Sequence, residues 1–180
     1  SGTLAKSRSV WLPETSISGL NIAPPNVGWC LKASSVFGFS VIVSEKEMLE
    51  AIDSTIYQIE SKDTTTIRAS VPMFLLSKYI RDNTDIKVIL SGEGSDEASG
   101  SYLYFHNAPN PTAFQNECIR LLKDVRFFDV LRGDKTTAGA GLEVRVPYFD
   151  KEFMEYYMGI DPKKKVVRDG MEKYLLRKAF

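Results

Sequence analysis

The feature that most constrains the fold is a short apolar run that leads into a loop rich in glycine and acid. Residues 86–90 read IKVIL, and residues 91–97 read SGEGSDE. A short β-branched run that enters a Ser-Gly turn predicts a buried parallel strand. In open α/β sheets, ligands gather at the carboxyl ends of such strands. The sequence therefore predicts an α/β protein with a ligand-binding loop at residues 91–97.

The residue types of this loop indicate a site for a metal and a phosphate. Gly92 and Gly94 allow positive φ angles and close approach of a ligand, and Ser91 supplies a hydroxyl donor. Glu93 and Asp96 would project hard oxygen ligands into the same crevice. Since the loop's carboxylates repel a bare phosphate, phosphate chemistry here requires a bridging Mg²⁺, which prefers carboxylate and phosphate oxygens.

A plainer interpretation of the loop stays open. Asp96 or Ser95 would cap a helix that begins near Glu97, and the loop would then serve only to connect a strand to that helix. Short patterns of glycine and acid recur by chance, so the loop by itself does not separate the two interpretations.

Five motifs, in order along the chain, carry a more specific signal. They are DTTTIRAS at 63–70, SGEGSDE at 91–97, YLYFHNAPN at 102–110, GLEVRVPYFD at 141–150 and EKYLLR at 172–177. Together they resemble the synthetase domain of glutamine-hydrolysing asparagine synthetases, over residues 44–180. The resemblance implies a partial synthetase domain at 44–180, preceded by an irregular or divergent segment at 1–43.

The resemblance implies a fold and a reaction. The fold would be α/β, a Rossmann-like adenine-nucleotide-hydrolase sheet of the ATP pyrophosphatase type, truncated, with a largely helical C-terminal half. In the family, ATP and Mg²⁺ activate the side-chain carboxylate of aspartate as β-aspartyl-AMP, and ammonia from glutamine then gives asparagine. The partners implied are aspartate, ammonia and, for a full-length protein, a second copy in a homodimer.

The resemblance also assigns residues, motif by motif. An arginine suits a carboxylate or a phosphate because its guanidinium binds such groups in a bidentate way. The implied roles are catalysis for Glu93, Asp96 and Arg68, metal binding for Glu93 and Asp96, nucleotide binding for Ser91, Gly92, Glu93 and Tyr102, and substrate binding for Thr65, Thr66 and Arg68. The alternatives are a surface cation at a helix start for Arg68 and a core side chain for Tyr102.

Several parts of the family pattern have no counterpart here. No Ser-Gly-Gly-x-Asp-Ser loop precedes Ser91, there is no glutaminase domain, and the Trp-Arg-x-Lys-x-x-Phe-Ser segment with its lysine does not follow. We therefore expect Glu93 and Asp96 to lack the lysine that offsets their charge, and little or no turnover from this polypeptide alone. Two alternatives remain: a non-catalytic remnant or interaction module, and another adenylate-forming amide synthetase such as a β-lactam synthetase.

Local patterns predict the main elements. A capping box at residues 44–47 opens a helix that continues to Ile59, and a second helix spans roughly 70–82 with Pro72 in its first turn. Residues 111–137 are predicted to be largely helical, with Phe114, Cys118, Leu121, Leu122 and Val125 in the core. Alternation at 142–146 predicts an extended segment with a local ion pair between Glu143 and Arg145. The polar residues Asp129, Arg132 and Asp134 match the family and would support the site through its neighbours.

Composition excludes several other classes. The 23 basic and 23 acidic residues cancel, so nothing points to nucleic acid. No apolar run approaches the ~20 residues that span a bilayer, and the first residues do not resemble a signal peptide. Cys30 and Cys118 form no Cys-x-x-Cys pattern, which favours reduced thiols in the cytoplasm. We interpret the basic run at 163–165 as an exposed turn, and we expect no nucleophilic role for His106.

Overall fold

The computed structural model describes residues 29–33 and 39–179. The predicted irregular opening, up to residue 26, lies outside the described residues. The chain is mixed α/β, mostly helical, with a small parallel sheet. In chain order the elements are β1 (Trp29–Ala33), β2 (Phe39–Val43), α1 (Glu45–Glu50), α2 (Ile52–Ile59), α3 (Thr64–Asn83), β3 (Val88–Leu90), α4 (Ser95–Ser99), η1 (Leu103–Asn107), α5 (Pro111–Asp124), η2 (Val125–Phe127), α6 (Asp129–Ala138), β4 (Glu143–Arg145), η3 (Pro147–Phe149), α7 (Lys151–Gly159), α8 (Pro162–Lys165) and α9 (Tyr174–Ala179), where η marks a short 3-10 helix.

The described strands form two pairs. β1 and β2 are antiparallel and lie within the segment predicted to be irregular or divergent. β3 and β4 are parallel, with Val88 opposite Glu143 and Leu90 opposite Arg145, which confirms the predicted parallel strand. The prediction that this strand is buried is wrong: Val88 is 42% and Leu90 is 68% exposed. Ile86 and Ile89 of the predicted run, which are partly buried, pack against a hydrophobic cluster.

The first helical region has the predicted start and an unpredicted break. Ser44 and Glu47 form the capping box, since the Ser44 hydroxyl accepts from the Glu47 N–H and the Glu47 carboxylate accepts from the Ser44 N–H. The helix divides at Ala51, whose ψ of −8° departs from the helical value near −42°. The predicted single helix is therefore two, α1 and α2.

The start of α3 corrects a second prediction. The helix begins at Thr64, because the Asp63 carboxylate accepts a hydrogen bond from the Thr66 N–H and caps it. Pro72 consequently lies in the interior of the helix and not in its first turn. A proline there cannot donate to the carbonyl four residues earlier, that of Arg68, so this carbonyl lacks its usual partner.

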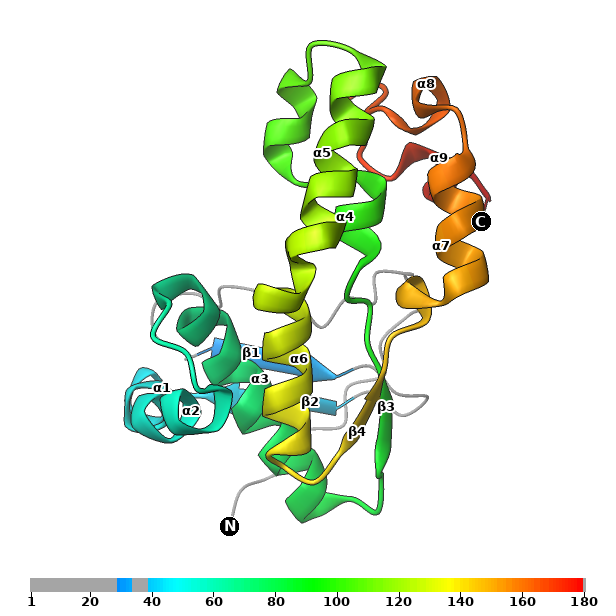
Figure 1. Cartoon of the computed structure of the whole chain (residues 1–180). Helices are drawn as coiled ribbons and strands as arrows, with labels where there is room; N and C mark the ends of the chain where they lie inside the picture. Colours follow the sequence, from blue (N-terminus) through cyan, green and yellow to red (C-terminus); the bar gives the residue numbers. More distant parts are fainter. Residues whose placement is uncertain (1–28, 34–38, 180) are drawn as a thin grey trace.

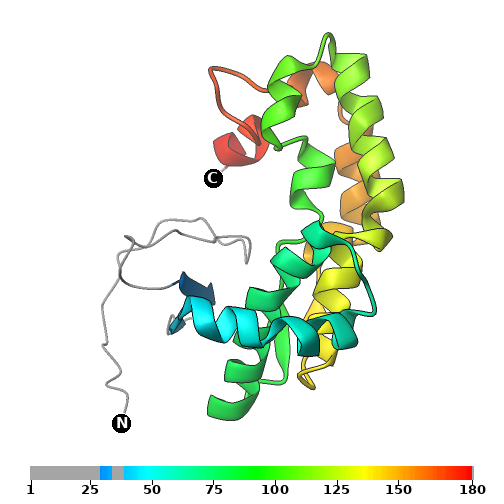
Figure 2. The same cartoon turned by 90° about the vertical axis from the view of Figure 1, so that its left-hand side faces the viewer.

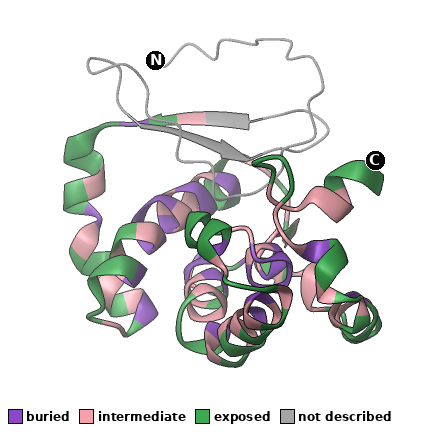
Figure 3. Cartoon of the chain, turned by 90° about the horizontal axis from the view of Figure 1, so that it is seen from above, coloured by how far each residue is buried: buried purple, intermediate pink, exposed green. Residues whose placement is uncertain are grey.

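Two small hydrophobic clusters lie on either side of the acidic loop. Figures 1 and 2 show α6 beside α3 in one part of the fold and α5 beside α4 in the other, with β3 and β4 leading from one part to the other. Figure 3 shows that buried residues lie on the inward sides of the helices. The first cluster contains Val43, Leu76, Ile80, Ala140 and Leu142, and the second contains Phe105, Phe114 and Cys118.

The C-terminal half confirms most of its predicted core and corrects one surface assignment. Phe114, Cys118 and Val125 are buried, as predicted. Lys163 and Lys164 are exposed at α8, but Lys165 is only 2% exposed. Its ammonium donates to the Tyr157 carbonyl and lies 5.3 Å from the centre of the Tyr157 ring. Within the described residues, no helix has the length and apolar character needed to cross a membrane.

Candidate active site

The acidic loop is shaped by the end of β3 and by one glycine. The Ser91 N–H donates to the Arg145 carbonyl at 2.8 Å, which extends the pairing of β3 with β4 into the loop. Gly94 has a φ of +89°, and a Cβ placed there would lie 2.7 Å from the Phe149 ring. Gly94 therefore has the positive φ that the sequence predicts, whereas Gly92 does not.

The helix that follows the loop, α4, begins without a side-chain cap. Gly94 occupies the N-cap position of α4, and no side chain caps the helix there. The helix begins at Ser95, so Asp96 and Glu97 both lie in its first turn. The interpretation in which Ser95 or Asp96 caps a helix beginning near Glu97 is wrong. These side chains make other contacts.

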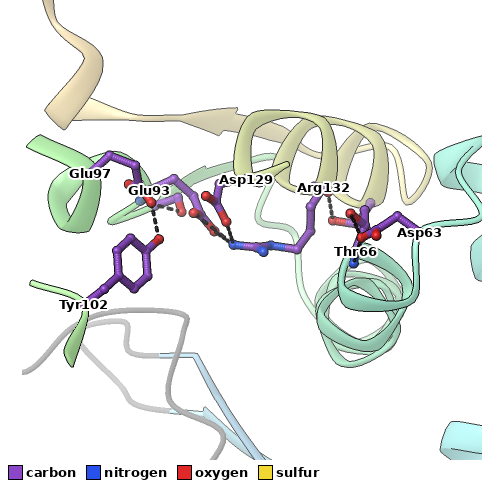
Figure 4. Close-up of polar contacts among 9 residues, drawn as sticks. Asp63, Thr66, Glu93, Glu97, Tyr102, Asp129 and Arg132 are labelled. Atoms are coloured by element: carbon purple, nitrogen blue, oxygen red, sulfur yellow. Dashed lines mark hydrogen bonds and ion pairs between the residues drawn. The ribbon is translucent and has the colours of Figure 1, made fainter. Parts of the chain in front are cut away.

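Glu93 is held by an arginine from α6. The Arg132 Nη2 lies 3.2 Å from Oε2 and 3.3 Å from Oε1 of Glu93, and it also pairs with Asp129 one turn earlier (Figure 4). All three side chains are between 14% and 16% exposed. Burial raises the pKa of Glu93 above its ordinary value, Arg132 opposes the rise and Asp129 adds to it. Of the three polar residues expected to support the site through its neighbours, Arg132 contacts Glu93 and Asp129 contacts Arg132, whereas Asp134 is exposed and takes no part in this contact.

Asp96 is held by a lysine from the far end of the chain. The Lys173 Nζ lies 2.7 Å from Asp96 Oδ1 and donates to the Ser95 hydroxyl at 2.9 Å. The Ser101 hydroxyl donates to the same Asp96 oxygen. The lysine of the Trp-Arg-x-Lys segment that was expected to offset the charge of Glu93 and Asp96 is not among these contacts, but Arg132 and Lys173 place one other cation beside each carboxylate.

Glu97 belongs to the same set of contacts, although no site role was predicted for it. It is 3% exposed and accepts a hydrogen bond from the Tyr102 hydroxyl (Figure 4). Burial raises the pKa of Glu97 to about 7, the hydrogen bond from Tyr102 opposes this rise, and the neighbouring Asp129 adds to it. The sequence feature that could have predicted the burial of Glu97 is the run of small residues that follows it, 98–100, because a compact turn buries its neighbours.

The polar contacts form one acidic cluster, which we define by its four carboxylates and two cations. The carboxylates come from the loop, from α4 and from α6, and the cations come from α6 and from the segment before α9. The members are Glu93, Asp96, Glu97, Asp129, Arg132 and Lys173. Carboxylates outnumber cations by two, so the cluster favours additional positive charge.

Tyr102 is not a core residue, but its side chain is held in place by its neighbours. The residue is 36% exposed, and its hydroxyl donates a hydrogen bond to Glu97. Burial and the Glu97 carboxylate both raise the pKa of this phenol. The ring lies parallel to that of Tyr104, with centroids 6.1 Å apart, so its orientation is set on two sides.

The residues predicted to bind substrate lie apart from these contacts. Thr65 and Arg68 are exposed on the first turns of α3, and the Thr66 side chain donates to Asp63 at 2.7 Å. Figure 4 shows Asp63 and Thr66 on the opposite side of Arg132 from Glu93. Among the described residues, no hydrogen bond or ion pair joins Thr65, Thr66 or Arg68 to the loop. The structure thus brings together the predicted residues of the loop and Tyr102, but not those of α3.

The chain was also compared with known proteins. The family model for asparagine synthase matches residues 27–114 and 106–180. The glutamine-hydrolyzing asparagine synthetases of Rattus norvegicus and Gallus gallus are 51% and 49% identical over 140 residues, which is 78% of this chain and 25% of each relative. That of Homo sapiens is 49% identical over 142 residues, or 79% of this chain and 25% of the relative.

These matches cover most of the chain, and the family model includes the acidic loop and the motifs on both sides of it. The chain spans about a quarter of the length of the curated relatives that it matches. The family model accounts for residues 27–180 without a gap. The chain therefore belongs to the asparagine synthase family.

Proposed function

We propose that this chain works in the ATP-dependent synthesis of asparagine from aspartate, with ammonia derived from glutamine. The observation that carries the proposal is the acidic cluster at the carboxyl end of a parallel strand, in a chain of the asparagine synthase family. The names of the relatives state glutamine hydrolysis and asparagine synthesis. Such a strand end is where ligands of α/β sheets bind.

The proposed reaction has two displacement steps. An oxygen of the aspartate side chain attacks the α-phosphorus of ATP, pyrophosphate leaves, and β-aspartyl-AMP forms. Ammonia then attacks the acyl carbon, AMP leaves, and the amide of asparagine remains after loss of a proton. Negative charge develops on the departing pyrophosphate, so fixed positive charge near it lowers the barrier.

Each predicted residue keeps the role proposed for it. Tyr102 offers a partly exposed ring whose orientation is held by Glu97, which suits a nucleotide-binding surface. Arg68 is exposed, and no ion pair links it to another described residue, so its guanidinium is available to a carboxylate. The proposed set is Ser91, Gly92, Glu93 and Tyr102 for nucleotide, Thr65, Thr66 and Arg68 for aspartate, Glu93 and Asp96 for metal, and Glu93, Asp96 and Arg68 for catalysis.

The residues of the loop fit Mg²⁺ bound together with phosphate. Among the described residues, no three acidic, histidine or cysteine side chains converge into a metal cage. Mg²⁺ bound with nucleotide needs no cage, because it takes one or two carboxylates and completes its shell with phosphate and water oxygens. Asp96 and Glu93 are hard oxygen donors, and each has a cationic group beside it. Mg²⁺ held there would neutralise charge on the departing pyrophosphate.

The wider setting is proposed on the same basis. We assign the parallel β3–β4 pair to a Rossmann-like, ATP-pyrophosphatase type of sheet, and the chain to a synthetase domain at 44–180. The predicted division at residue 43 stays a prediction, as do a cytoplasmic location and a homodimer. That this polypeptide alone turns over slowly, if at all, is likewise still a prediction.

Binding of Mg-ATP and release of pyrophosphate test the proposal on the chain itself. Calorimetric titration with Mg-ATP compares the chain with Glu93→Gln and with Glu143→Gln, which removes an equal charge from an exposed pair on β4. We expect binding by the chain, at least about tenfold weaker binding by Glu93→Gln, and no change for Glu143→Gln. Equal binding by all three folded proteins would refute the role of the loop.

The same samples, given Mg-ATP, aspartate and ammonia, report turnover. Any pyrophosphate release that depends on aspartate should disappear in Glu93→Gln. A folded chain that binds no nucleotide would favour the interaction-module alternative, and release that depends on a substrate other than aspartate would favour another amide synthetase.

A further inference from the structure

Lys173 reaches the acidic cluster from a distant part of the sequence. It lies 77 positions after Asp96, just before α9, and its side chain is 23% exposed. Its ammonium contacts Asp96 Oδ1 at 2.7 Å and the Ser95 hydroxyl at 2.9 Å. The ammonium therefore lies between two oxygen atoms, and hard metal cations also bind to oxygen atoms of this kind.

The backbone at Lys173 is held in an unusual conformation. Its φ is +54°, in the left-handed region that non-glycine residues seldom adopt. Such conformations persist where the surroundings over-determine them, and they cluster at functional sites. The neighbouring Glu172 is anchored separately, because its carboxylate lies 2.5 Å from His106 Nε2. The segment thus has an anchor that does not depend on the contact between Lys173 and Asp96.

We propose that Lys173 is a stand-in cation, so that its ammonium and a bound Mg²⁺ compete for Asp96. This inference rests on the proposed function, since it uses the metal site assigned to Asp96 there. Lys173 holds the carboxylate in place while the metal is absent. When the metal binds, the ammonium leaves Asp96, and the anchor at Glu172 keeps it nearby.

Electrostatics gives the direction of the effect. Removing the positive charge of Lys173 leaves Asp96 without a cation, near Glu93 and Asp129, which share a single arginine. A divalent cation then no longer has to displace the ammonium or be repelled by it. The interaction free energy of two unit charges a few ångströms apart near a protein surface corresponds to more than a tenfold change in a binding constant. The pair is partly exposed, so we expect about a tenfold gain in metal affinity on losing Lys173.

The test is a titration with Mn²⁺, which takes the same hard oxygen ligands as Mg²⁺, in the presence of a non-hydrolysable ATP analogue at one fixed concentration. Samples without protein give the binding of Mn²⁺ by the analogue itself. Free Mn²⁺ is followed by electron paramagnetic resonance at low salt, with Mg²⁺ added as competitor. The variants are Lys173→Met, Lys173→Arg, which keeps the charge, and Asp96→Asn. Lys178→Met is the matched control, because it removes an equal charge from an exposed lysine on α9.

The expected order separates this inference from the proposed function. Lys173→Met should bind Mn²⁺ about tenfold more tightly than the unmodified chain, Lys173→Arg and Lys178→Met should match it, and Asp96→Asn should lose binding. Equal or weaker binding by Lys173→Met, with Asp96→Asn still deficient, overturns the inference alone. Binding by no protein, or binding untouched by Asp96→Asn, overturns the metal site and the inference together.

Folding of each variant is checked by far-ultraviolet circular dichroism. Should Lys173→Met fail to fold, Lys173→Gln takes its place, because its amide keeps a donor toward Ser95 while the charge is lost. The same tenfold gain is expected from it, and its absence carries the same meaning.

Discussion

Arg132 is the cation on which the acidic cluster depends most, and Arg132→Met removes it while keeping an apolar stem of similar length. In the structure, one nitrogen of Arg132 serves both Glu93 and Asp129. Without it, two carboxylates that are 14% and 16% exposed are left beside each other with no cation between them. Burying charge without a partner is costly, so the variant should be less stable.

The magnitude follows from measurements on similar pairs. Removing one partner of a buried ion pair destabilises by about 3–5 kcal/mol. The side chains here keep some solvent contact, so we expect the lower end, about 3 kcal/mol. For a chain of this size that is a fall of roughly 6–12 °C in Tm. Part of the loss should be recovered by adding Glu93→Gln, because the uncompensated charge is then removed.

The loss should depend on pH, and the sign follows from linkage. Burial and Asp129 already raise the pKa of Glu93, and without Arg132 this pKa rises further. Between the ordinary value and the raised value, the folded chain binds more protons than the unfolded chain, so its stability falls as the pH increases. The deficit of Arg132→Met should therefore be larger at pH 7 than near pH 4.5.

Urea unfolding followed by circular dichroism at both pH values measures these differences. The matched control is Arg145→Met, whose pair with Glu143 is 64% and 60% exposed and should contribute no more than about 1 kcal/mol. The reasoning fails if Arg132→Met loses no more than the control, or if its loss is the same at pH 4.5 and pH 7.

Three further outcomes are expected. As the pH rises from about 4.5 to 7, the stability of Glu97→Gln should fall less than that of the unmodified chain. The reason is that the raised pKa of Glu97 makes the folded chain favour the neutral carboxyl group, which glutamine mimics at every pH. Parallel pH profiles of unfolding for the two proteins would contradict this. Lys165→Met should be more stable than the unmodified chain at pH 7 by about 1–3 kcal/mol. Burial lowers the pKa of Lys165, so this gain should shrink as the pH approaches 10 and the lysine becomes neutral. A gain in denaturant titrations that stays constant with pH would count against this reasoning. Gly94→Ala should destabilise by about 2–4 kcal/mol through left-handed strain and the clash with Phe149, whereas Gly159→Ala, with no atom within 4 Å of the new Cβ, should cost far less by thermal unfolding.

Local patterns were sufficient for several elements because their causes are local. The capping box at Ser44 and Glu47 and the ion pair between Glu143 and Arg145 each involve residues no more than three positions apart. The strand before the loop was predicted from its β-branched run, and its parallel pairing is confirmed. The start of α3 was predicted too late, near residue 70, because proline favours the first turn of a helix and Pro72 was given more weight than the capping residue Asp63.

Contacts between distant residues were beyond such patterns. That Lys173 would neutralise Asp96, and that Arg132 would join Glu93 to Asp129, depends on how α6 and the segment before α9 pack around the loop. The burial of Glu97 and Lys165 has the same origin. Sequence spacing indicates pairs between near neighbours such as Glu143 and Arg145, but it does not indicate which basic and acidic residues meet when they lie far apart in the chain.

The sequence by itself determined the family, the parallel strand and the loop of carboxylates that follows it, because ordered motifs and β-branched runs are properties of neighbouring residues. Only the tertiary structure decided the charge balance of that loop. Ionic contacts over 39 and 77 positions form when helices pack, and low solvent access then sets which carboxyl groups keep a proton.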